Sequence, residues 1–375
     1  MRNTQKILCS RRKIDLECRD MKKTKIAING FGRIGRAFLK AAMDKPELEF
    51  VVINDLGDPE MLAYLLKYDS AYGRFDGKVG FLNEGGKNYL VVSPSSRKAT
   101  KDAQEKKILF LSEKDTAKLP WKELGVDIAV EATGVFESYE KAKFHLDQGA
   151  KRVVLTAPAK DEDGELGKTV LLGANEEALK TCLISSNGSC TTNSAHPVMA
   201  ILSETLGIKK SFLVSTHGYT ATQNIVDGPT KSKDMRRGRA AAVNISPSFT
   251  GATIAVERAV GAVKGKFGGA AFRVPVLTGS ISAITSLVGR PTTIEEVNGI
   301  FKKAEEDSKW RGIMRTTSEE LVSTDIIGEP HGSIIDLGLT QVTDGDLVTV
   351  FAWYDNEAGY TNTLVEHVLR VANLL

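Results

Sequence analysis

A glycine-rich turn between a buried strand and a helix constrains this fold more than any other feature. Residues 25–29 have the sequence Lys-Ile-Ala-Ile-Asn, which predicts a buried strand, and Gly-Phe-Gly-Arg-Ile-Gly follows over 30–35. A helix is predicted over 36–43 and a second strand over 50–53. Glycines here allow a tight turn and let the backbone approach a pyrophosphate at the helix N-terminus. The pattern predicts a dinucleotide-binding βαβ unit.

An acidic residue follows the second strand at the distance that this unit requires. Asp55 lies twenty residues beyond Gly35, and a carboxylate there accepts hydrogen bonds from the adenosine ribose. The same charge would repel a 2′-phosphate, so NAD is favoured over NADP. An ordinary βα turn with glycines placed by chance is the alternative, and it would not require this acid at this spacing.

Length and composition limit the remaining classes of protein. The chain has 375 residues, which suggests two domains with one core each. It is 42% hydrophobic and 26% charged, it has no apolar run as long as a membrane span, and its net charge is only +3. We therefore expect a soluble protein with no membrane partner and no nucleic-acid partner.

The four cysteines indicate the redox state of the compartment and not a structural framework. Cys9, Cys18, Cys182 and Cys190 have a spacing that fits neither a zinc site nor a disulfide framework. We expect no metal, and a reducing compartment such as the cytoplasm.

Residues 1–21 differ from the rest of the chain. The first 20 residues carry six basic and three acidic side chains, and Met21 leads almost directly into the first predicted strand. No secretory apolar segment is present, and the acidic residues argue against an organelle transit peptide. We expect this extension to be either a disordered tail or sequence that lies before the natural start.

A cysteine at a predicted strand-to-helix junction is the second strong feature. Strand-like segments over 170–172 and 182–184 precede Cys190, a segment with helical spacing follows over 195–206, and Gly207 predicts its end. Free backbone N–H groups and the positive end of the helix dipole favour a thiolate at such a position. Cys190 is therefore a candidate nucleophile, although a lone cysteine is also a common small core residue.

A histidine that could activate this cysteine follows. Residues 210–216 alternate like a strand and end at His217. An antiparallel return after the helix would bring this imidazole beside Cys190, as in other nucleophile–base pairs. On spacing alone, catalysis and a structural role both remain open.

The sequence around Cys190 and His217 resembles that of a known family. Ser-Asn-Gly-Ser-Cys-Thr-Thr-Asn over 186–193 and His-Gly-Tyr-Thr over 217–220 closely resemble the active-site signature of phosphorylating glyceraldehyde-3-phosphate dehydrogenases. Residues 66–75 and the run Trp-Tyr-Asp-Asn-Glu-Ala-Gly-Tyr over 353–360 resemble the same family. The resemblance extends from about residue 22 to the end of the chain.

The resemblance implies the fold and the assembly. It implies an α/β protein with a Rossmann doubly wound parallel sheet over 22–189 and an α+β catalytic domain with a mixed, largely antiparallel sheet over 190–356. Residues 357–375 would form a closing helix that packs back on the NAD-binding domain. A homotetramer, in which the loop over 223–239 reaches a neighbour's cofactor, is also implied by the resemblance.

Further residues are expected at the cofactor. Topology places Thr133, Gly134 and Thr156 at the carboxyl ends of strands, on the cofactor side. The resemblance adds Lys114 near the adenine and Asn356 at the nicotinamide carboxamide. The complete expected set is Gly30, Gly32, Arg33, Ile34, Gly35, Asp55, Lys114, Thr133, Gly134, Thr156 and Asn356.

An arginine in an apolar run suggests an anion. Arg273 lies within Ala-Ala-Phe-Arg-Val-Pro over 270–275 and needs either a structural carboxylate or a substrate phosphate as its partner. Thr250 is predicted to be the N-cap of another helix, which would form a second anion site. The resemblance implies that Thr220 and Arg273 hold the substrate's C3 phosphate. It implies that inorganic phosphate is held by Ser189, Thr191, Thr250, Gly251 and Arg237, where Arg236 or Arg239 could take the place of Arg237.

Two departures from the family pattern carry expectations. His196 is expected to face away from Cys190 at the surface, and is therefore not expected to act as a second base. The connection over 93–107 is longer than usual, and we expect a solvated hairpin extension with no assigned function.

The implied reaction is the NAD-dependent oxidative phosphorylation of D-glyceraldehyde 3-phosphate to 1,3-bisphosphoglycerate through a thioester on Cys190. His217 would be its base. One alternative is erythrose-4-phosphate dehydrogenase, in which water cleaves the thioester. Another is a non-catalytic NAD-binding regulatory protein, which would not need Cys190 and His217 together.

Overall fold

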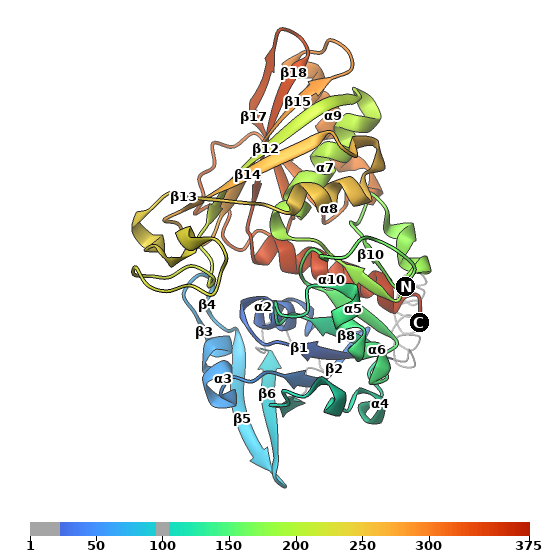
Figure 1. The fold of residues 1–375 in the computed structure, drawn as a ribbon, viewed down its shortest axis with the longest axis vertical. Helices are drawn as coiled ribbons and strands as arrows, with labels where there is room; N and C mark the ends of the chain where they lie inside the picture. Colours follow the sequence, from blue (N-terminus) through green and yellow to red (C-terminus); the bar gives the residue numbers. More distant parts are fainter. Residues whose placement is uncertain (1–22, 95–104) are drawn as a thin grey trace, which may run out of the picture.

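The computed structural model describes residues 23–94 and 105–375. The expectations for residues 1–21 and for the centre of the 93–107 connection lie outside these described residues. The rest of the chain forms a nine-stranded sheet and a seven-stranded sheet, which lie in the lower and upper halves of Figure 1. A two-stranded sheet joins β3 to β4.

The nine-stranded sheet has the predicted Rossmann character. Its order is β10-β11-β9-β8-β1-β2-β7-β6-β5, and every pair from β10 to β7 is parallel. The strand order reverses on either side of β1, which is where such sheets bind ligands. Its strands are β1 (Thr24–Asn29), β2 (Leu48–Asn54), β5 (Gly77–Glu84), β6 (Lys87–Pro94), β7 (Lys106–Leu111), β8 (Ile128–Glu131), β9 (Arg152–Leu155), β10 (Gly167–Thr169) and β11 (Ile184–Ser186).

The helices of this half cover the sheet and close the glycine turn. The first helix begins three residues earlier than predicted, at Arg33, directly after the turn. A side chain at Gly35 would collide with the carbonyl oxygen of Gly30 at 2.1 Å, and Gly30 has a φ of +96°. The turn therefore requires glycine at both positions. The helices are α2 (Arg33–Ala42), α3 (Pro59–Lys67), α4 (Trp121–Leu124), α5 (Tyr139–Ala142) and α6 (Phe144–Asp147), and the small strands are β3 (Tyr68–Asp69) and β4 (Gly73–Arg74).

The second sheet is mixed and largely antiparallel, as predicted. Its order is β13-β14-β12-β15-β18-β17-β16, with parallel pairs only at β12–β14 and β16–β17. Its strands are β12 (Ile208–Gly218), β13 (Ser246–Ser248), β14 (Phe267–Val274), β15 (Ser280–Val288), β16 (Met314–Thr317), β17 (Ser333–Thr343) and β18 (Leu347–Tyr354). Its helices are α7 (Cys190–Thr205), α8 (Ala252–Ala259) and α9 (Ile294–Glu306).

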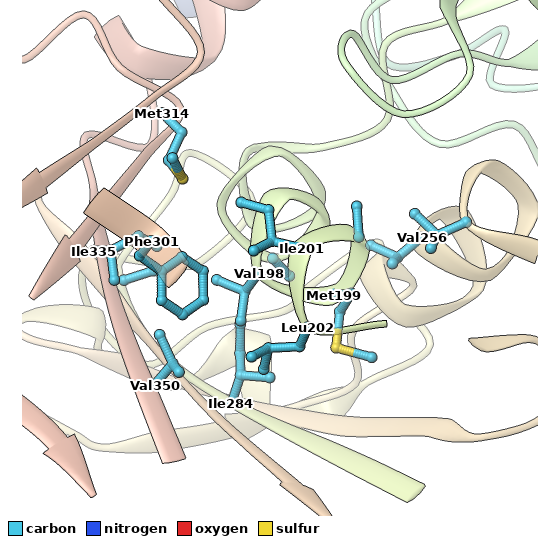
Figure 2. Close-up of a cluster of buried hydrophobic side chains, with 14 of the residues drawn as sticks. Val198, Met199, Ile201, Leu202, Val256, Ile284, Phe301, Met314, Ile335 and Val350 are labelled. Atoms are coloured by element: carbon cyan, nitrogen blue, oxygen red, sulfur yellow. The ribbon is translucent and has the colours of Figure 1, made fainter. Parts of the chain in front are cut away.

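Helix α7 is the centre of the second core. Figure 2 shows Val198, Ile201 and Leu202 of this helix among side chains from the sheet and from α8 and α9. Every residue from Thr191 to Leu202 is buried, so α7 has no solvent-facing side over this length. The helix ends where Gly207, with a φ of +70°, follows its last turn, as predicted. Because the helix is enclosed in this way, the backbone of Cys190 at its first position is held in a fixed place.

The surface position expected for His196 is wrong. Its side chain is fully buried, with Nε2 3.0 Å from the Leu172 carbonyl oxygen and Nδ1 3.3 Å from the Thr192 carbonyl oxygen. The expectation assumed a solvent-facing side on α7, which does not exist here. Burial lowers the pKa of His196 to about 4, so the imidazole is neutral at physiological pH.

The last helix, α10 (Ala358–Ala372), joins the two halves. It contacts α2 of the first half and α7 of the second, and Figure 1 shows it crossing between the sheets. Leu364, Val365, Val368 and Val371 belong to the same apolar cluster as the strands of the nine-stranded sheet. In the part of the chain that the structure describes, no helix is long and apolar enough to cross a membrane.

Candidate active site

The structure brings the predicted nucleophile and base together. Cys190 is the first residue of α7, and Ser189 caps the helix by accepting a hydrogen bond from the Thr192 N–H at 3.1 Å. His217 is the penultimate residue of β12, the strand that returns antiparallel to β15. Cys190 Sγ lies 3.2 Å from His217 Nε2. This is within the hydrogen-bond distance for sulfur, so the prediction that the two side chains meet is confirmed.

The orientation of the imidazole suits a base. His217 Nδ1 lies 2.6 Å from the Gly218 carbonyl oxygen, which can only accept a hydrogen bond. In the tautomer that donates Nδ1–H to this carbonyl, Nε2 is unprotonated and directed at the thiol, and the Arg273 guanidinium then lies beside Nδ1 without a hydrogen bond to it. Burial, and secondarily the Arg273 charge, lower the pKa of His217 to about 3. The ring is therefore neutral and able to accept a proton at physiological pH.

The thiol differs from the sequence expectation of a thiolate. Burial raises the pKa of Cys190, whereas Arg273 and the backbone N–H groups of Thr191 and Cys190 lower it. The helix N-terminus thus acts in the predicted direction, but loss of hydration has the larger effect. With a raised thiol pKa beside a neutral imidazole, attack by the sulfur would require transfer of the thiol proton to His217.

Arg273 lies directly beside His217. Strands β12 and β14 are parallel, and their register pairs these two residues. The Arg273 guanidinium contacts His217 Nδ1 and lies 3.3 Å from the Gly218 carbonyl oxygen. Among residues 23–94 and 105–375, no carboxylate forms an ion pair with it. Of the two partners considered from the sequence, the structural carboxylate is therefore absent from the described part of the chain.

A cavity of about 450 Å³ lies at the carboxyl end of β1. Its lining includes Gly30, Gly32, Asp55, Lys114 and Thr133 from the expected cofactor set. A Cβ on Gly32 would meet no atom within 4 Å, whereas one on Gly30 would lie 2.5 Å from the Thr133 backbone nitrogen. The turn thus leaves open space above Gly32, as the close approach of a pyrophosphate requires.

The Asp55 carboxylate is held at the edge of this cavity. One oxygen accepts from the Phe31 N–H at 2.6 Å and the other from the Gly57 N–H at 2.7 Å. Each oxygen retains a further lone pair for a ribose hydroxyl. These residues fit the adenosine and pyrophosphate of a dinucleotide.

Comparisons with known proteins agree with this geometry. Residues 24–139 match the family model described as "Glyceraldehyde 3-phosphate dehydrogenase, NAD binding domain", and residues 189–356 match "Glyceraldehyde 3-phosphate dehydrogenase, C-terminal domain". The chain is 47% identical to "Glyceraldehyde-3-phosphate dehydrogenase" of Thermotoga maritima, over 91% of this chain and 97% of the relative. The protein of the same name from Clostridium pasteurianum is 43% identical, over 91% and 96% respectively, and that of Mycobacterium avium is 42% identical, over 94% and 99%.

The chain belongs to the glyceraldehyde-3-phosphate dehydrogenase family. The cofactor of the chain is NAD, since residues 24–139 match the family's NAD-binding domain, and the cavity at β1 lies in this part of the chain.

The remaining residues expected at the cofactor do not line this cavity. Thr156 follows β9 and donates its N–H to the Glu131 carbonyl oxygen, and Gly134 has a φ of +69° after β8. The Arg33 side chain turns away from the cavity and forms ion pairs with Asp69 and Glu357. The expected roles of the other residues that do not line the cavity concern the cofactor outside this volume or the backbone that shapes it; they are Ile34, Gly35, Gly134, Thr156 and Asn356.

Some of the residues expected to bind phosphate form hydrogen bonds with other side chains in this structure. The Thr220 hydroxyl lies 3.0 Å from that of Thr222, and Thr191 Oγ1 lies 3.0 Å from the Tyr354 phenol. Thr250 is not the N-cap of α8 as predicted. That position is Gly251, and Thr250 Oγ1 accepts from the Ala252 N–H at 3.2 Å instead, because the helix begins one residue later.

The three arginines of the long loop have different partners. Arg236 pairs with Asp234 at 2.8 Å, and Arg239 pairs with Asp227 at 3.0 Å. Arg237 instead donates to the Thr222 hydroxyl at 2.5 Å and contacts the Ser248 hydroxyl. In the described part of the chain Arg237 therefore has no neutralising carboxylate, and it shares one partner, the Thr222 hydroxyl, with Thr220.

Tyr354 is a site residue that sequence reasoning missed. Its hydroxyl bonds both Thr191 and Ser215, and its ring stands edge-on to His217 with the centroids 5.9 Å apart. Burial raises its pKa to about 12, so it remains a neutral phenol. The residue lies within the Trp-Tyr-Asp-Asn run, but only the asparagine was selected from it. No group of three or more potential metal ligands occurs in the described ranges.

Proposed function

We propose that this protein oxidises D-glyceraldehyde 3-phosphate and phosphorylates the product to 1,3-bisphosphoglycerate. The observation that carries the proposal is the grouping of three side chains: Cys190 Sγ lies 3.2 Å from His217 Nε2, and Arg273 lies beside His217 with no carboxylate partner among the residues that the structure describes. A nucleophile, its base and an unpaired cation suit a phosphorylated aldehyde. The relatives' names support this substrate.

The Cys190–His217 pair would form the covalent intermediate. Nε2 of His217 takes the thiol proton as Sγ forms a bond to the aldehyde carbon, and the proton is returned to the resulting oxygen to give a hemithioacetal. The Cys190 N–H at the start of α7 and the imidazolium stabilise negative charge on that oxygen meanwhile. When bound, NAD supplies the acceptor for the hydride that leaves the carbon.

His217 would act a second time as the thioester forms. Its Nε2 accepts the hydroxyl proton, and the carbon–oxygen double bond is restored with the carbon still bonded to Sγ. A phosphate oxygen then attacks this carbon, the C–S bond breaks, and Sγ recovers a proton from His217. The thioester retains free energy that hydrolysis would release, and this allows an acyl phosphate to form.

Two cationic positions would separate the two phosphates. Arg273 and Thr220 would hold the C3 phosphate. Arg273 lies beside His217, so a short substrate whose aldehyde carbon reacts at Cys190 and His217 could place its phosphate on this arginine. Arg237, rather than Arg236 or Arg239, would hold inorganic phosphate together with Ser189, Thr191, Thr250 and Gly251. This choice is supported by the ion pairs that occupy the other two arginines.

We further infer a homotetramer in the cytoplasm, with domains at 22–189 plus 357–375 and at 190–356. The loop between β12 and α8 exposes large apolar side chains. A second copy of the chain would cover them in the tetramer. They are Ile225 (78% exposed), Val226 (73%), Met235 (85%), Val243 (75%), Ile245 (70%) and Phe249 (76%). Sedimentation analysis would test the assembly.

The decisive experiment measures NADH formation at pH 8 with D-glyceraldehyde 3-phosphate and with erythrose 4-phosphate, each with and without inorganic phosphate. We expect fast, phosphate-dependent turnover of the first aldehyde only. Preference for the second aldehyde without phosphate would support erythrose-4-phosphate dehydrogenase. An absence of turnover, with Cys190 inert to iodoacetamide, would support the non-catalytic binding protein.

A further inference from the structure

Asp355 is a buried carboxylate that links both halves of the molecule. It follows β18 and has no exposed surface. Its Oδ1 accepts from the Tyr72 hydroxyl at 2.7 Å and from the Thr278 hydroxyl at 3.0 Å, and its Oδ2 accepts from the Gly328 N–H at 2.8 Å. The N–H groups of residues 357 and 358, at the start of α10, also donate to Oδ1. A buried carboxylate with these partners is held in one orientation.

The next residue, Asn356, has its amide oxygen fixed in the same way. Oδ1 accepts from the Gly279 N–H at 3.2 Å, from the Ser280 hydroxyl at 3.0 Å and from the Thr278 hydroxyl at 3.3 Å. Thr278 therefore touches both Asp355 and Asn356. Because the oxygen is engaged, the amide NH₂ of Asn356 remains to donate to an acceptor on a ligand. The carboxamide of nicotinamide carries such an acceptor.

Of the two side chains described as donors to Asp355, Tyr72 comes from the nine-stranded half of the molecule and Thr278 from the other half. Tyr72 lies in the turn between β3 and β4, 283 residues from its partner in sequence. The Arg33 guanidinium stands 5.8 Å from its ring centre and also pairs with Asp69 and Glu357. The pyrophosphate turn, the β3–β4 turn and the start of α10 are thus connected at this point.

We propose that Tyr72 is a positioning residue for the nicotinamide end of NAD, acting through Asp355 on the Asn356 amide. The proposal rests on the assignment of NAD and Asn356 under the proposed function. The Tyr72 hydroxyl supplies a hydrogen bond from the NAD-binding half to the Asp355 side chain, directly before Asn356. Loss of that bond leaves a buried carboxylate one donor short. The Asn356 amide then has more freedom, and the carboxamide is held less tightly.

The test compares two ligands that differ only at the nicotinamide. NAD and ADP-ribose share the adenosine and the pyrophosphate, but ADP-ribose lacks the carboxamide. Dissociation constants for both are measured by calorimetry on the whole protein and its Tyr72→Phe variant. Tyr68→Phe is the matched control, because Tyr68 lies in the same hairpin and its hydroxyl makes no described hydrogen bond.

In Tyr72→Phe we expect NAD to bind about tenfold more weakly, because a hydrogen bond to a carboxylate is lost. ADP-ribose affinity should stay unchanged, and Tyr68→Phe should resemble the wild type with both ligands. Equal weakening of both ligands would mean that Tyr72 supports only the turn, and unchanged binding of both would mean that Asn356 does not depend on it. Either result would overturn the proposal.

Two further variants keep the test decisive. Thr278→Val removes a hydroxyl that contacts both Asp355 and Asn356, and should give the same selective loss even if Tyr72→Phe folds poorly. In the Asn356→Ala background, Tyr72→Phe should have no further effect on NAD affinity, since the two would act through one amide. Additive losses would contradict the mechanism. Because these are binding measurements, they remain informative even if aldehyde oxidation fails and the proposed reaction is wrong.

Discussion

Two buried histidines, His217 and His196, resemble each other in burial and pKa but differ in their hydrogen-bond partners. His217 and His196 are 3% and 0% exposed, and burial lowers their pKa values to about 3 and about 4. Both are therefore neutral rings in the core. His217 Nε2 faces the Cys190 thiol, whereas both nitrogens of His196 face backbone carbonyl oxygens of Leu172 and Thr192.

The difference shows that a low pKa and burial do not identify a base. A ring whose nitrogens both face carbonyl oxygens has no proton to accept from them, and so it holds α7 against the segment at Leu172. A ring with one nitrogen on a carbonyl and the other on a thiol has a defined tautomer and a partner that can give up a proton. The hydrogen-bond partners, rather than burial, distinguish the histidine proposed as the base from the one with a structural position.

The largest expected effect on activity comes from removal of the Cys190 thiol, the partner that distinguishes His217 from His196. Cys190→Ala should lower NADH formation from D-glyceraldehyde 3-phosphate by more than about 10⁴-fold, because no covalent intermediate can form. Steady-state assays under saturating NAD and phosphate measure this. Cys182→Ala is the control and should keep its activity, since Cys182 is buried away from His217. Substantial turnover by Cys190→Ala would show that the sulfur is not the nucleophile.

The exchange of His217 for asparagine should have the next largest effect. His217→Asn should slow turnover by about 10²- to 10⁴-fold, the usual contribution of a positioned general base. Pre-steady-state hydride transfer, followed by NADH absorbance, measures the affected step. Near-normal hydride transfer would remove the distinction between the two histidines.

Arg273 sharpens the comparison, because only His217 has such a neighbour. Arg273→Leu should lower kcat/KM for the phosphorylated aldehyde by about 10²-fold, through loss of a charge-assisted contact to the C3 phosphate. Unphosphorylated glyceraldehyde should be affected far less. Arg239→Leu, which removes a surface ion pair with Asp227, should change neither value. An equal loss with both aldehydes would place the role of Arg273 at His217 instead.

The smallest effect on activity is expected at His196, where acid stability changes instead. The unfolded chain binds a proton at this ring near its ordinary pKa of about 6.5, and the folded protein only near about 4. Stability therefore falls as pH decreases through that window, by about 1.4 kcal/mol per pH unit for one such group. His196→Gln should show a shallower acid limb in urea unfolding, with kcat close to the wild type. A large loss of kcat with unchanged acid stability would contradict the structural role.

The sequence predicted the parts of the site that are set by local order. The meeting of Cys190 and His217 follows from a helix start and a strand end that are neighbours along the chain. Apart from the family resemblance, Arg273 could be predicted only as a cation in need of an anion, since its place beside His217 depends on the parallel register of β12 and β14. That register is a property of the whole sheet.

Other features depended on contacts distant in sequence. His196 was misplaced because the enclosure of α7 comes from β17, β18 and α9, which no local periodicity reveals. The loss of hydration that outweighs the helix N-terminus at Cys190 has the same origin. The hydrogen bond between Tyr72 and Asp355 spans 283 residues, so neither residue has a role that local sequence could predict.

The transfer of the Cys190 proton to His217 can be measured most directly by alkylation. Iodoacetamide labelling of Cys190, followed by peptide mass spectrometry from pH 5 to 10, should be about tenfold faster at neutral pH in the wild type than in His217→Asn. The profile of the variant should be displaced to higher pH, because the thiol must then ionise without a base. Superimposable profiles for the two proteins would contradict the account, since they would show that the imidazole 3.2 Å from the sulfur takes no part in activating it.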